Sequence, residues 1–382
     1  MLPLKGYRVL DLTATIFGPI ASQVLADYGA DVVKIEPPGG DAMRANGPSK
    51  EPGMSSNFIA VNRGKRSAVI DLKTGAGRQA LLELAAGADI VMHTIRPQKL
   101  AAIGLDEAVL RRRNPKLVYA SLVGFDGAGP YSGRPAYDDI LQGMAGNVDL
   151  MFRQVGTPHY FPAIVADKTS GLVAVSAILA ALVARERTGE GSHVEVPMFE
   201  SMVAFNLVEH LFGRHFEPPA GSIGYARVLN PWRRPFRTTD GYICALPITD
   251  AQWARFFEGV GQPELAADAR FASQTVRTQN APVLYELVGR HLERRTTDEW
   301  LRFFEDIDVP ASRIAGLEDL LHDEHLRATG FFETISDPAM GDVVYPGVPV
   351  RFNGARPPAR MAPRLGEHTE QVLGELRSRA AA

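Results

Sequence analysis

The sequence has little cysteine, little net charge and no long apolar run, and each shortage excludes a class of protein. Cys244 is the only cysteine among 382 residues, so neither an intramolecular disulfide nor a thiolate metal site can form. A net charge of −3 gives no electrostatic reason to bind nucleic acid or an anionic membrane. The apolar stretch 172–184 is shorter than the roughly 20 residues that cross a bilayer, so we interpret it as part of a core helix.

The usual nucleotide and metal signatures are also missing. The turn after the first expected strand reads LTATIFGP (12–19) and has one glycine, where a dinucleotide fingerprint needs three small positions. Glu36 ends the second expected strand, as the ribose-binding acid of such folds does, but the glycines that would hold the pyrophosphate are absent. No Walker loop and no His/Cys cluster is present, so we expect neither phosphate transfer nor a bound metal.

What the chain does contain is a regular alternation of strand and helix patterns in its N-terminal third. Such an alternation predicts βαβ units around a mostly parallel sheet, whose carboxyl-terminal strand ends bind ligands. Strands are expected at 7–12, 31–36, 67–72, 89–93 and 117–122, with helices at 18–28, 76–86 and 106–113 between them. A strand this close to the start leaves no room for a signal peptide, so we expect a cytoplasmic protein.

The second half changes in composition. Proline and glycine are frequent at 213–235, which we interpret as a linker between a large domain, 1–212, and a smaller α+β domain, 236–334. A turn at Asp240 and Gly241 predicts a hairpin there, in which the alternation around Cys244 predicts a buried thiol. The last segment, 335–382, is expected to complete the large domain, with a strand near 348–352.

Asp167 is the most informative single residue. It follows an apolar run and precedes a long, Ala-rich helical pattern that reaches Arg187 and ends at Gly189. A carboxylate at this place faces the free N–H groups of a helix start. On the residues alone it is either an N-cap, a role for which Asp is among the preferred residues, or a nucleophile.

Five motifs, in order, resemble the class III CoA-transferase family, the CaiB/BaiF group that includes formyl-CoA transferases. They span roughly the first half of the chain, and the second half is similar more loosely, through TDG (239–241) and DAQW (250–253). The motifs are GADVVKIEPPGGD (29–41), NRGKRS (62–67) with DLK (71–73), PAYD (135–138) with Gln142 and Gly146, ADKTSG (166–171) and RTGEG (187–191).

The resemblance implies a fold, a partner and an activity. The fold would be a Rossmann-like large domain with a smaller α+β domain, in a homodimer whose subunits interlock as rings. The activity would move CoA from an acyl-CoA to a free carboxylic acid, with both as substrates and no permanently bound cofactor. Asp167 would be the nucleophile, forming first an aspartyl-acyl anhydride and then an aspartyl-CoA thioester. The helix N–H groups would keep Asp167 ionised.

The same resemblance implies a set of CoA-binding residues. Lys73 would pair with a CoA phosphate, and otherwise is a surface lysine; Arg66 and Arg44 are further candidates of that kind. Tyr137 would pack on pantetheine or fill the core. The full set is Thr15, Ile16, Ile70, Asp71, Leu72, Lys73, Thr94, Ile95, Arg96 and Tyr137.

Some features depart from the family pattern and keep rival functions open. Pro37 stands where relatives often have Arg, and 230–235 replaces the glycine-rich lid of formyl-CoA transferases, where Arg233, Arg234 and Arg237 either bind a diacid or are exposed linker residues. An α-methylacyl-CoA racemase would need a base in place of Tyr137, a role for which Asp138 and Asp139 are nearby. A non-catalytic acyl-CoA-binding relative is the third interpretation.

Overall fold

The computed structural model describes residues 1–380, and the chain divides into two compact units. Unit 1 comprises Met1–Ala145, Phe161–Phe205 and Glu324–Ala382, and unit 2 comprises Gly146–Tyr160 and Asn206–Asp323. The boundaries differ from the expected 213–235 linker and 335 return. The segment 146–160 joins unit 2, where the buried Asn147 accepts a hydrogen bond of 2.9 Å from the side chain of Asn206.

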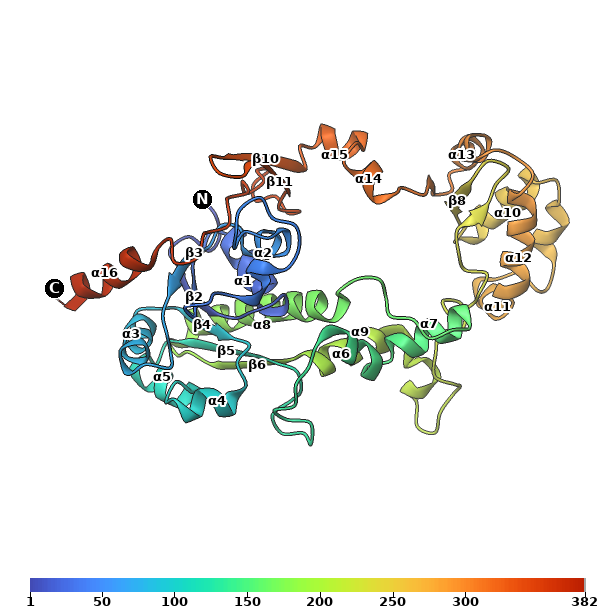
Figure 1. Ribbon diagram of the computed structural model, residues 1–382. Helices are drawn as coiled ribbons and strands as arrows, with labels where there is room; N and C mark the ends of the chain where they lie inside the picture. Colours follow the sequence, from blue (N-terminus) through green and yellow to red (C-terminus); the bar gives the residue numbers. More distant parts are fainter. Residues whose placement is uncertain (381–382) are drawn as a thin grey trace. The chain divides into compact units, whose positions relative to one another are not determined.

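Unit 1 is built on a six-stranded, wholly parallel sheet with the order β3-β2-β1-β4-β5-β6. The strands are β1 (Arg8–Leu12), β2 (Asp31–Glu36), β3 (Arg66–Val69), β4 (Ile90–His93), β5 (Val118–Val123) and β6 (His193–Pro197). This is the Rossmann order, in which the direction of winding reverses between the first and fourth strands. The mixed α/β fold expected from the sequence is confirmed (Figure 1).

Helices cover both faces of the sheet, which is why its strands are buried on both sides. Successive strand residues such as Val9 and Leu10 belong to different apolar clusters, because their side chains point to opposite faces of the sheet. The Val9 face packs against α1 (Phe17–Asp27) and α8 (Val165–Thr188), and the Leu10 face against α3 (Gly75–Ala86), α5 (Glu107–Arg113) and α16 (Thr369–Ala380).

The rest of unit 1 consists of a hairpin and the remaining helices. A hairpin of β10 (Phe332–Asp337) and β11 (Gly341–Pro346) buries Tyr345 in an apolar cluster that includes Phe58. The strand expected at 348–352 is wrong: that segment has only an isolated bridge at Phe352, and Pro349 within it has no N–H to donate to a ladder. The other elements are η1 (Ala42–Ala45), α2 (Ser56–Asn62), α4 (Pro97–Ala102), α6 (Asp138–Met144), α9 (Met198–His210), which continues into unit 2, and α15 (Glu324–Ala328).

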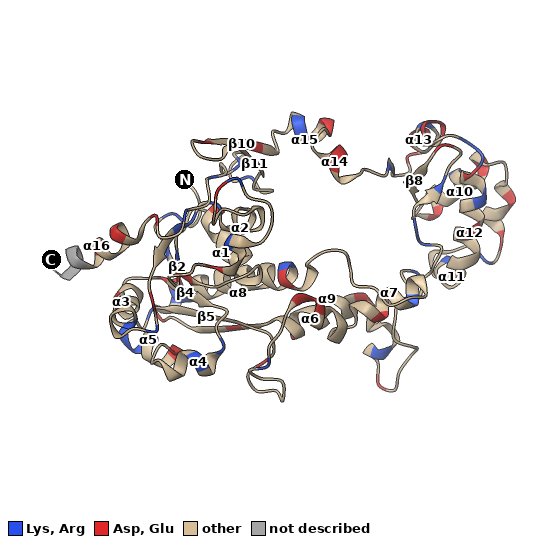
Figure 2. Cartoon of the chain, in the orientation of Figure 1, with Lys and Arg blue, Asp and Glu red and all other residues tan. Residues whose placement is uncertain are grey.

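Unit 2 is an α+β unit around an aromatic core. Its antiparallel sheet of β7 (Phe236–Arg237), β8 (Tyr242–Ala245) and β9 (Ala311–Arg313) packs against helices that bury residues such as Trp253 and Phe304. Acidic and basic side chains are interspersed along these helices (Figure 2). The helices are α7 (Asn147–Val155), η2 (Phe212–His215), α10 (Asp250–Gly259), η3 (Pro263–Ala267), α11 (Gln274–Gln279), α12 (Ala281–Leu292), α13 (Thr297–Asp306) and α14 (Leu317–Leu320).

The expected burial of Cys244 is wrong. Along β8 the side chains of Ile243 and Ala245 point inward, so the alternation leaves Cys244 exposed. The pattern GYICAL was apolar at consecutive positions, and apolar residues alone do not set the phase of a strand.

Helix α8 is longer than the apolar stretch 172–184 suggested. Its 24 residues are long and apolar enough, by length and composition, to cross a membrane, and half of the most apolar window is buried inside the structure. It crosses α1 closely at Gly171, where a Cβ would lie 2.6 Å from Cγ2 of Ile20 and 3.0 Å from the carbonyl oxygen of Phe17. Gly171 therefore sets how near the two helices approach.

We expect Gly171→Ala to lower the stability of unit 1 by about 1–3 kcal/mol, because the added methyl overpacks a crossing that includes backbone. The measurement is urea unfolding followed by circular dichroism. The matched control is Gly143→Ala in α6, where the added Cβ meets no atom within 4 Å and no loss is expected. Equal stability of the two variants would contradict this account of the crossing.

Candidate active site

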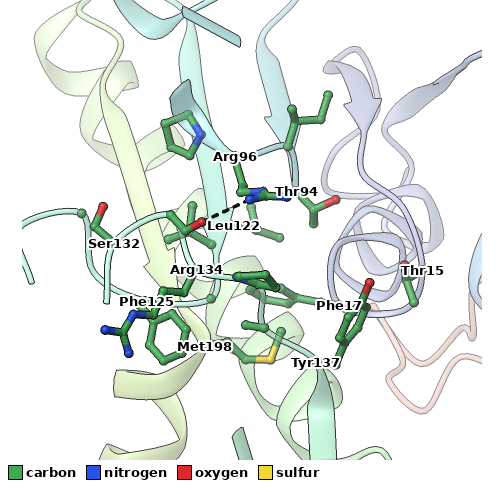
Figure 3. Close-up of a pocket in the computed structure, with 18 of the residues that line it drawn as sticks. Thr15, Phe17, Thr94, Arg96, Leu122, Phe125, Ser132, Arg134, Tyr137 and Met198 are labelled. Carbon is green, nitrogen blue, oxygen red and sulfur yellow. Dashed lines mark hydrogen bonds between the residues drawn. The ribbon is translucent and has the colours of Figure 1, made fainter. Parts of the chain in front are cut away.

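A cavity of about 370 Å³ opens at the carboxyl ends of β1, β4 and β5. Its wall is made by the segments that follow these strands, including Thr15, Arg96 and Phe125, and by Tyr137 (Figure 3). Asp167 also lines the cavity. The winding of the sheet reverses between β1 and β4, and the crevice at such a reversal is where open α/β sheets bind ligands. The cavity is therefore the candidate active site.

Buried charges hold the turn after β1 in place. Asp11 accepts a hydrogen bond of 2.9 Å from the backbone N–H of Thr13, and the ammonium of Lys34 donates to the carbonyl of Thr13 at 2.9 Å. Burial alone would raise the pKa of Asp11, but the ammonium groups of Lys65 and Lys34 outweigh it and lower that pKa to about 2. This network supports Thr15, which lines the cavity with a left-handed φ of 71° that is uncommon for a residue with a Cβ.

The segment after β4 forms the neighbouring part of the wall. The hydroxyl of Thr94 accepts a hydrogen bond of 3.0 Å from the backbone N–H of Ala14, which links this segment to the turn after β1. Arg96 donates to the carbonyl of Gly133 at 3.5 Å (dashed in Figure 3). The guanidinium of Arg134 lies 4.6 Å from the ring centre of Tyr131. Two cationic side chains, Arg96 and Arg134, thus border the cavity.

Asp138 and Gln142, both on α6, fix the chain that leads into α8. One oxygen of Asp138 accepts the backbone N–H groups of Ala166 and Asp167 at 2.7 and 3.1 Å. Its other oxygen accepts from the amide of Gln142 at 2.6 Å. Gln142 in turn bonds the carbonyl of Ala163 at 3.1 Å and the N–H of Phe161 at 2.8 Å.

Asp167 is the third residue of α8 and lies in the cavity wall, with 8% of its surface exposed. The N-cap interpretation is wrong, because Ile164 occupies that position and Asp138 bonds the helix N–H groups. Among the described residues, none donates a hydrogen bond to the Asp167 carboxylate. Burial, and secondly the charge of Asp138, raise the pKa of Asp167 to about 7. The expectation that helix N–H groups keep Asp167 ionised is therefore also wrong.

The structure separates the ten expected CoA-binding residues into two groups. Those that line the cavity with Asp167 are Thr15, Thr94, Ile95, Arg96 and Tyr137. Those outside it are Ile16, Ile70, Asp71, Leu72 and Lys73. Of these, Ile16 and Ile70 are buried in apolar clusters, while Lys73 is exposed and its N–H donates to the carboxylate of Asp71 at 3.0 Å.

The structure bears on three of the alternatives raised by the sequence. Tyr137 does not fill the core, since 70% of its surface is exposed. Arg44 is a buried partner of Glu36 at 2.7 Å, and Arg66 pairs with Asp31, so both have structural partners. In unit 2, a separate cavity of about 400 Å³ is bordered by Arg233 and Arg234, both exposed, and by Cys244; Arg237 is not part of its lining.

Other cavity residues were missed from the sequence. Ser132 and Arg134 lie in the Gly/Pro-rich loop 124–133 and just after it, Glu195 lies on β6, and Met198 begins α9. The available signal was topological: a loop that leaves a parallel strand at its carboxyl end lies at the ligand-binding edge. Within residues 1–380, no group of three His, Cys, Asp or Glu side chains is placed to hold a metal ion.

We expect Asp167→Asn to make the protein more stable than the wild type above pH 7. Unfolded Asp167 ionises near its ordinary pKa of 3.8 and folded Asp167 near 7, so the folded state loses stability as the pH rises between these values. The loss is complete above pH 7, where it reaches at most about 4 kcal/mol. Urea unfolding at several pH values measures it, with the exposed Asp139→Asn as control. A stability difference that does not change between pH 4 and 8 would contradict the buried, half-ionised carboxyl.

Comparison with known proteins identifies the family. The family model for CoA-transferase family III matches residues 4–369. The chain is 35% identical to a succinate–glutarate CoA-transferase of Agrobacterium fabrum, over 98% of this chain and 96% of that enzyme. It is 31% identical to the succinyl-CoA:glutarate CoA-transferase of Mus musculus, over 98% and 87%.

The fold agrees with this assignment. The crystal structure of a CaiB/BaiF family protein from Brucella suis superposes with a TM-score of 0.79 at 33% identity, covering 98% of this chain and 99% of that one. Family model, sequence relatives and solved structure all extend over nearly the whole chain. The protein belongs to CoA-transferase family III.

Proposed function

We propose that this CoA-transferase works through covalent catalysis by Asp167, with short dicarboxylic acids and their CoA esters as substrates. The observation that carries the proposal is the state of the Asp167 carboxylate. It lies in the wall of a cavity, is largely buried, and receives no hydrogen bond from any described residue. A carboxylate with so little solvation is a good nucleophile once ionised.

The reaction proceeds in balanced acyl transfers that need no net proton movement. An oxygen of Asp167 attacks the thioester carbon, the C–S bond breaks, and CoA thiolate leaves a mixed anhydride. The thiolate attacks the aspartyl carbonyl of this anhydride, which releases the donor acid and leaves an aspartyl-CoA thioester. The acceptor carboxylate displaces the thiolate to form a second anhydride. Attack of the thiolate on its acyl carbon then releases the new acyl-CoA and free Asp167.

The cavity residues are proposed to bind the thiol end of CoA. Thr15, Thr94, Ile95, Arg96 and Tyr137 surround the space into which pantetheine would have to reach Asp167. The exposed Tyr137 would gain an apolar contact there. Ile16, Ile70, Asp71, Leu72 and Lys73 lie outside this cavity, and we retain them as proposed contacts for more distant parts of CoA.

The substrate class follows from charge and from the relatives. Two relatives are named for succinate or succinyl-CoA and glutarate, which carry a second carboxylate besides the reacting one. Arg96 and Arg134 border the cavity and offer guanidinium groups of the kind that bind carboxylates. We therefore propose succinyl-CoA and glutarate as the first pair to assay.

A racemase-type proton transfer has less support. That reaction needs a free base beside Asp167, and Asp138 was the nearest candidate. Its two oxygens accept the N–H groups of Ala166 and Asp167 and the amide of Gln142. Tyr137 carries a phenol, whose ordinary pKa near 10 makes it a poor base at neutral pH.

We further propose that two copies associate as the interlocked homodimer implied by the family resemblance. Support comes from unit 1 itself, where apolar side chains of α8 and α9 are exposed: Leu172 by 60%, Val183 by 53% and Phe205 by 51%. Both helices carry few charges over most of their length (Figure 2). Such an apolar surface is typical of a protein–protein contact.

The catalytic proposal predicts a trapped intermediate. Incubation with succinyl-CoA and hydroxylamine is expected to convert Asp167 to a hydroxamate, detected by mass spectrometry of the peptide. Asp167→Ala is expected to lose CoA exchange with glutarate by several orders of magnitude, while Asp139→Asn retains it. Full exchange by Asp167→Ala would end the mechanism. Solvent deuterium at the α-carbon of a branched acyl-CoA, without trapping, would instead favour the racemase, and binding without either would indicate an acyl-CoA-binding protein.

The association proposal predicts a mass in solution of twice that of the chain, measured by light scattering over a tenfold range of concentration. Interlocked rings cannot separate without unfolding, so dilution is expected to leave the mass unchanged. A concentration-independent monomer would contradict the homodimer.

A further inference from the structure

The start of α8 presents unusual hydrogen bonding. The first N–H groups of a helix have no partner within the helix, and an acidic side chain in the first turn is normally drawn to them. Asp167 is such a side chain, at the third position of α8. Yet no described N–H group bonds its carboxylate, and Asp138 from another helix bonds the N–H groups of Ala166 and Asp167.

The two N–H groups bond the same oxygen of Asp138, at 2.7 and 3.1 Å. The other oxygen is held at 2.6 Å by Gln142, which is 99% buried and is itself anchored to the backbone at Ala163 and Phe161. Asp138 therefore cannot turn away without breaking three hydrogen bonds. The carboxylate of Asp138 thus occupies the N–H groups that the carboxylate of Asp167 would otherwise bind.

We propose that Asp138 is a positioning residue for the transferase reaction: by bonding the N–H groups at the start of α8, it withholds them from Asp167 and leaves that carboxylate turned to the cavity. The inference rests on the proposed function, in which Asp167 is the nucleophile. It assigns to Asp138 a role through Asp167 rather than contact with the substrate.

Two physical effects follow from this arrangement. First, Asp167 keeps both oxygens available, because hydrogen bonds to a carboxylate consume the lone pairs that attack the thioester. Second, the negative charge of Asp138 opposes ionisation of Asp167, in addition to burial, and together they raise the pKa of Asp167 to about 7. A more basic, less solvated carboxylate is the better nucleophile at neutral pH.

The other charged or titratable groups around Asp167 do not bond the N–H groups at the start of α8. The cavity wall contributes Arg96, Arg134, Tyr137 and Glu195, and α8 contributes the exposed Lys168. α1 contributes no charged side chain to the wall, only the apolar Phe17. Asp139 follows Asp138 on α6, but its side chain is exposed and accepts neither the N–H of Ala166 nor that of Asp167.

Two substitutions separate the charge of Asp138 from its hydrogen bonds. In Asp138→Asn the amide oxygen still accepts the two N–H groups, so only the charge is lost, although the new amide faces that of Gln142. In Asp138→Ala both are lost, the amide clash is avoided, and the N–H groups become available to Asp167. Asp139→Asn removes an equal charge one residue away and is the matched control.

The first readout does not depend on activity. Each protein is compared with the same protein carrying Asp167→Asn, and their difference in unfolding free energy is measured by urea unfolding at several pH values. This difference changes between the unfolded-state and the folded-state pKa of Asp167, so the midpoint at its upper end reports the folded-state pKa. We expect this midpoint near pH 7 for the wild type and for Asp139→Asn. It should fall by about one pH unit in Asp138→Asn and further in Asp138→Ala.

The second readout is the rate at which succinyl-CoA acylates the enzyme in a single turnover. Asp138→Asn is expected to be several-fold faster than the wild type near pH 5.5, because more Asp167 is ionised, and slower at pH 8, because the carboxylate is less nucleophilic. A purely structural loss would slow the reaction equally at both pH values.

The outcomes are distinct. Unchanged midpoints in folded Asp138→Asn and Asp138→Ala would overturn the positioning role. Should Asp138→Asn fail to fold, Asp138→Ala alone decides the matter by the same midpoint. A wild type that is never acylated by any CoA ester would remove the proposed function, while the midpoints would still report whether Asp138 controls Asp167.

Discussion

The site depends on one constraint, that the backbone N–H groups at the start of α8 must be hydrogen-bonded. The chain meets it from outside the helix, with the carboxylate of Asp138 held by Gln142. Three features of the site accompany that arrangement: the segment 161–164 is tied to α6, the first turn of α8 is fixed, and the Asp167 carboxylate lies in the cavity wall with no hydrogen bond from any described residue. Burying an acid without hydrogen-bond partners costs free energy, and groups held at such a cost are found mainly at active sites.

The parallel sheet supplies the frame for this arrangement. Strands β1, β4 and β5 end at one edge, and the reversal of winding between β1 and β4 opens the crevice that the cavity occupies. Buried ion pairs then fix the turn after β1: Lys65 lies 3.1 Å from Asp11, and Lys34 lies 2.8 Å from Asp41. The lysines of the KIE and GKR motifs thus serve the shape of the turn, where a dinucleotide-binding fold would have used glycines.

Much of the fold was legible in the sequence, because strands buried on both faces and the helices between them have strong periodic patterns. The strands at 31–36 and 117–122 and the helix at 76–86 were predicted to within two residues. The short helices α2 and α4 and the hairpin β10–β11 have no such pattern, since tertiary contacts stabilise them. Asp167 could be singled out by its place before an Ala-rich helix, but the bonding of Asp138 joins residues 28 and 29 positions apart, and no local pattern encodes such a contact.

One feature of unit 1 bears on how the protein is made. Helix α16 covers β3 and the apolar cluster on the Leu10 face of the sheet, where Val372 is fully buried. Its Glu375 pairs with both Arg8 and Arg66. Strands β1 and β3 are thus synthesised before the whole of unit 2, and the helix that covers them is synthesised after it. Until residues 369–380 have been added, this face of the sheet lacks the apolar cover of Val372 and the ion pairs of Glu375, so the parallel sheet of unit 1 cannot reach its full stability.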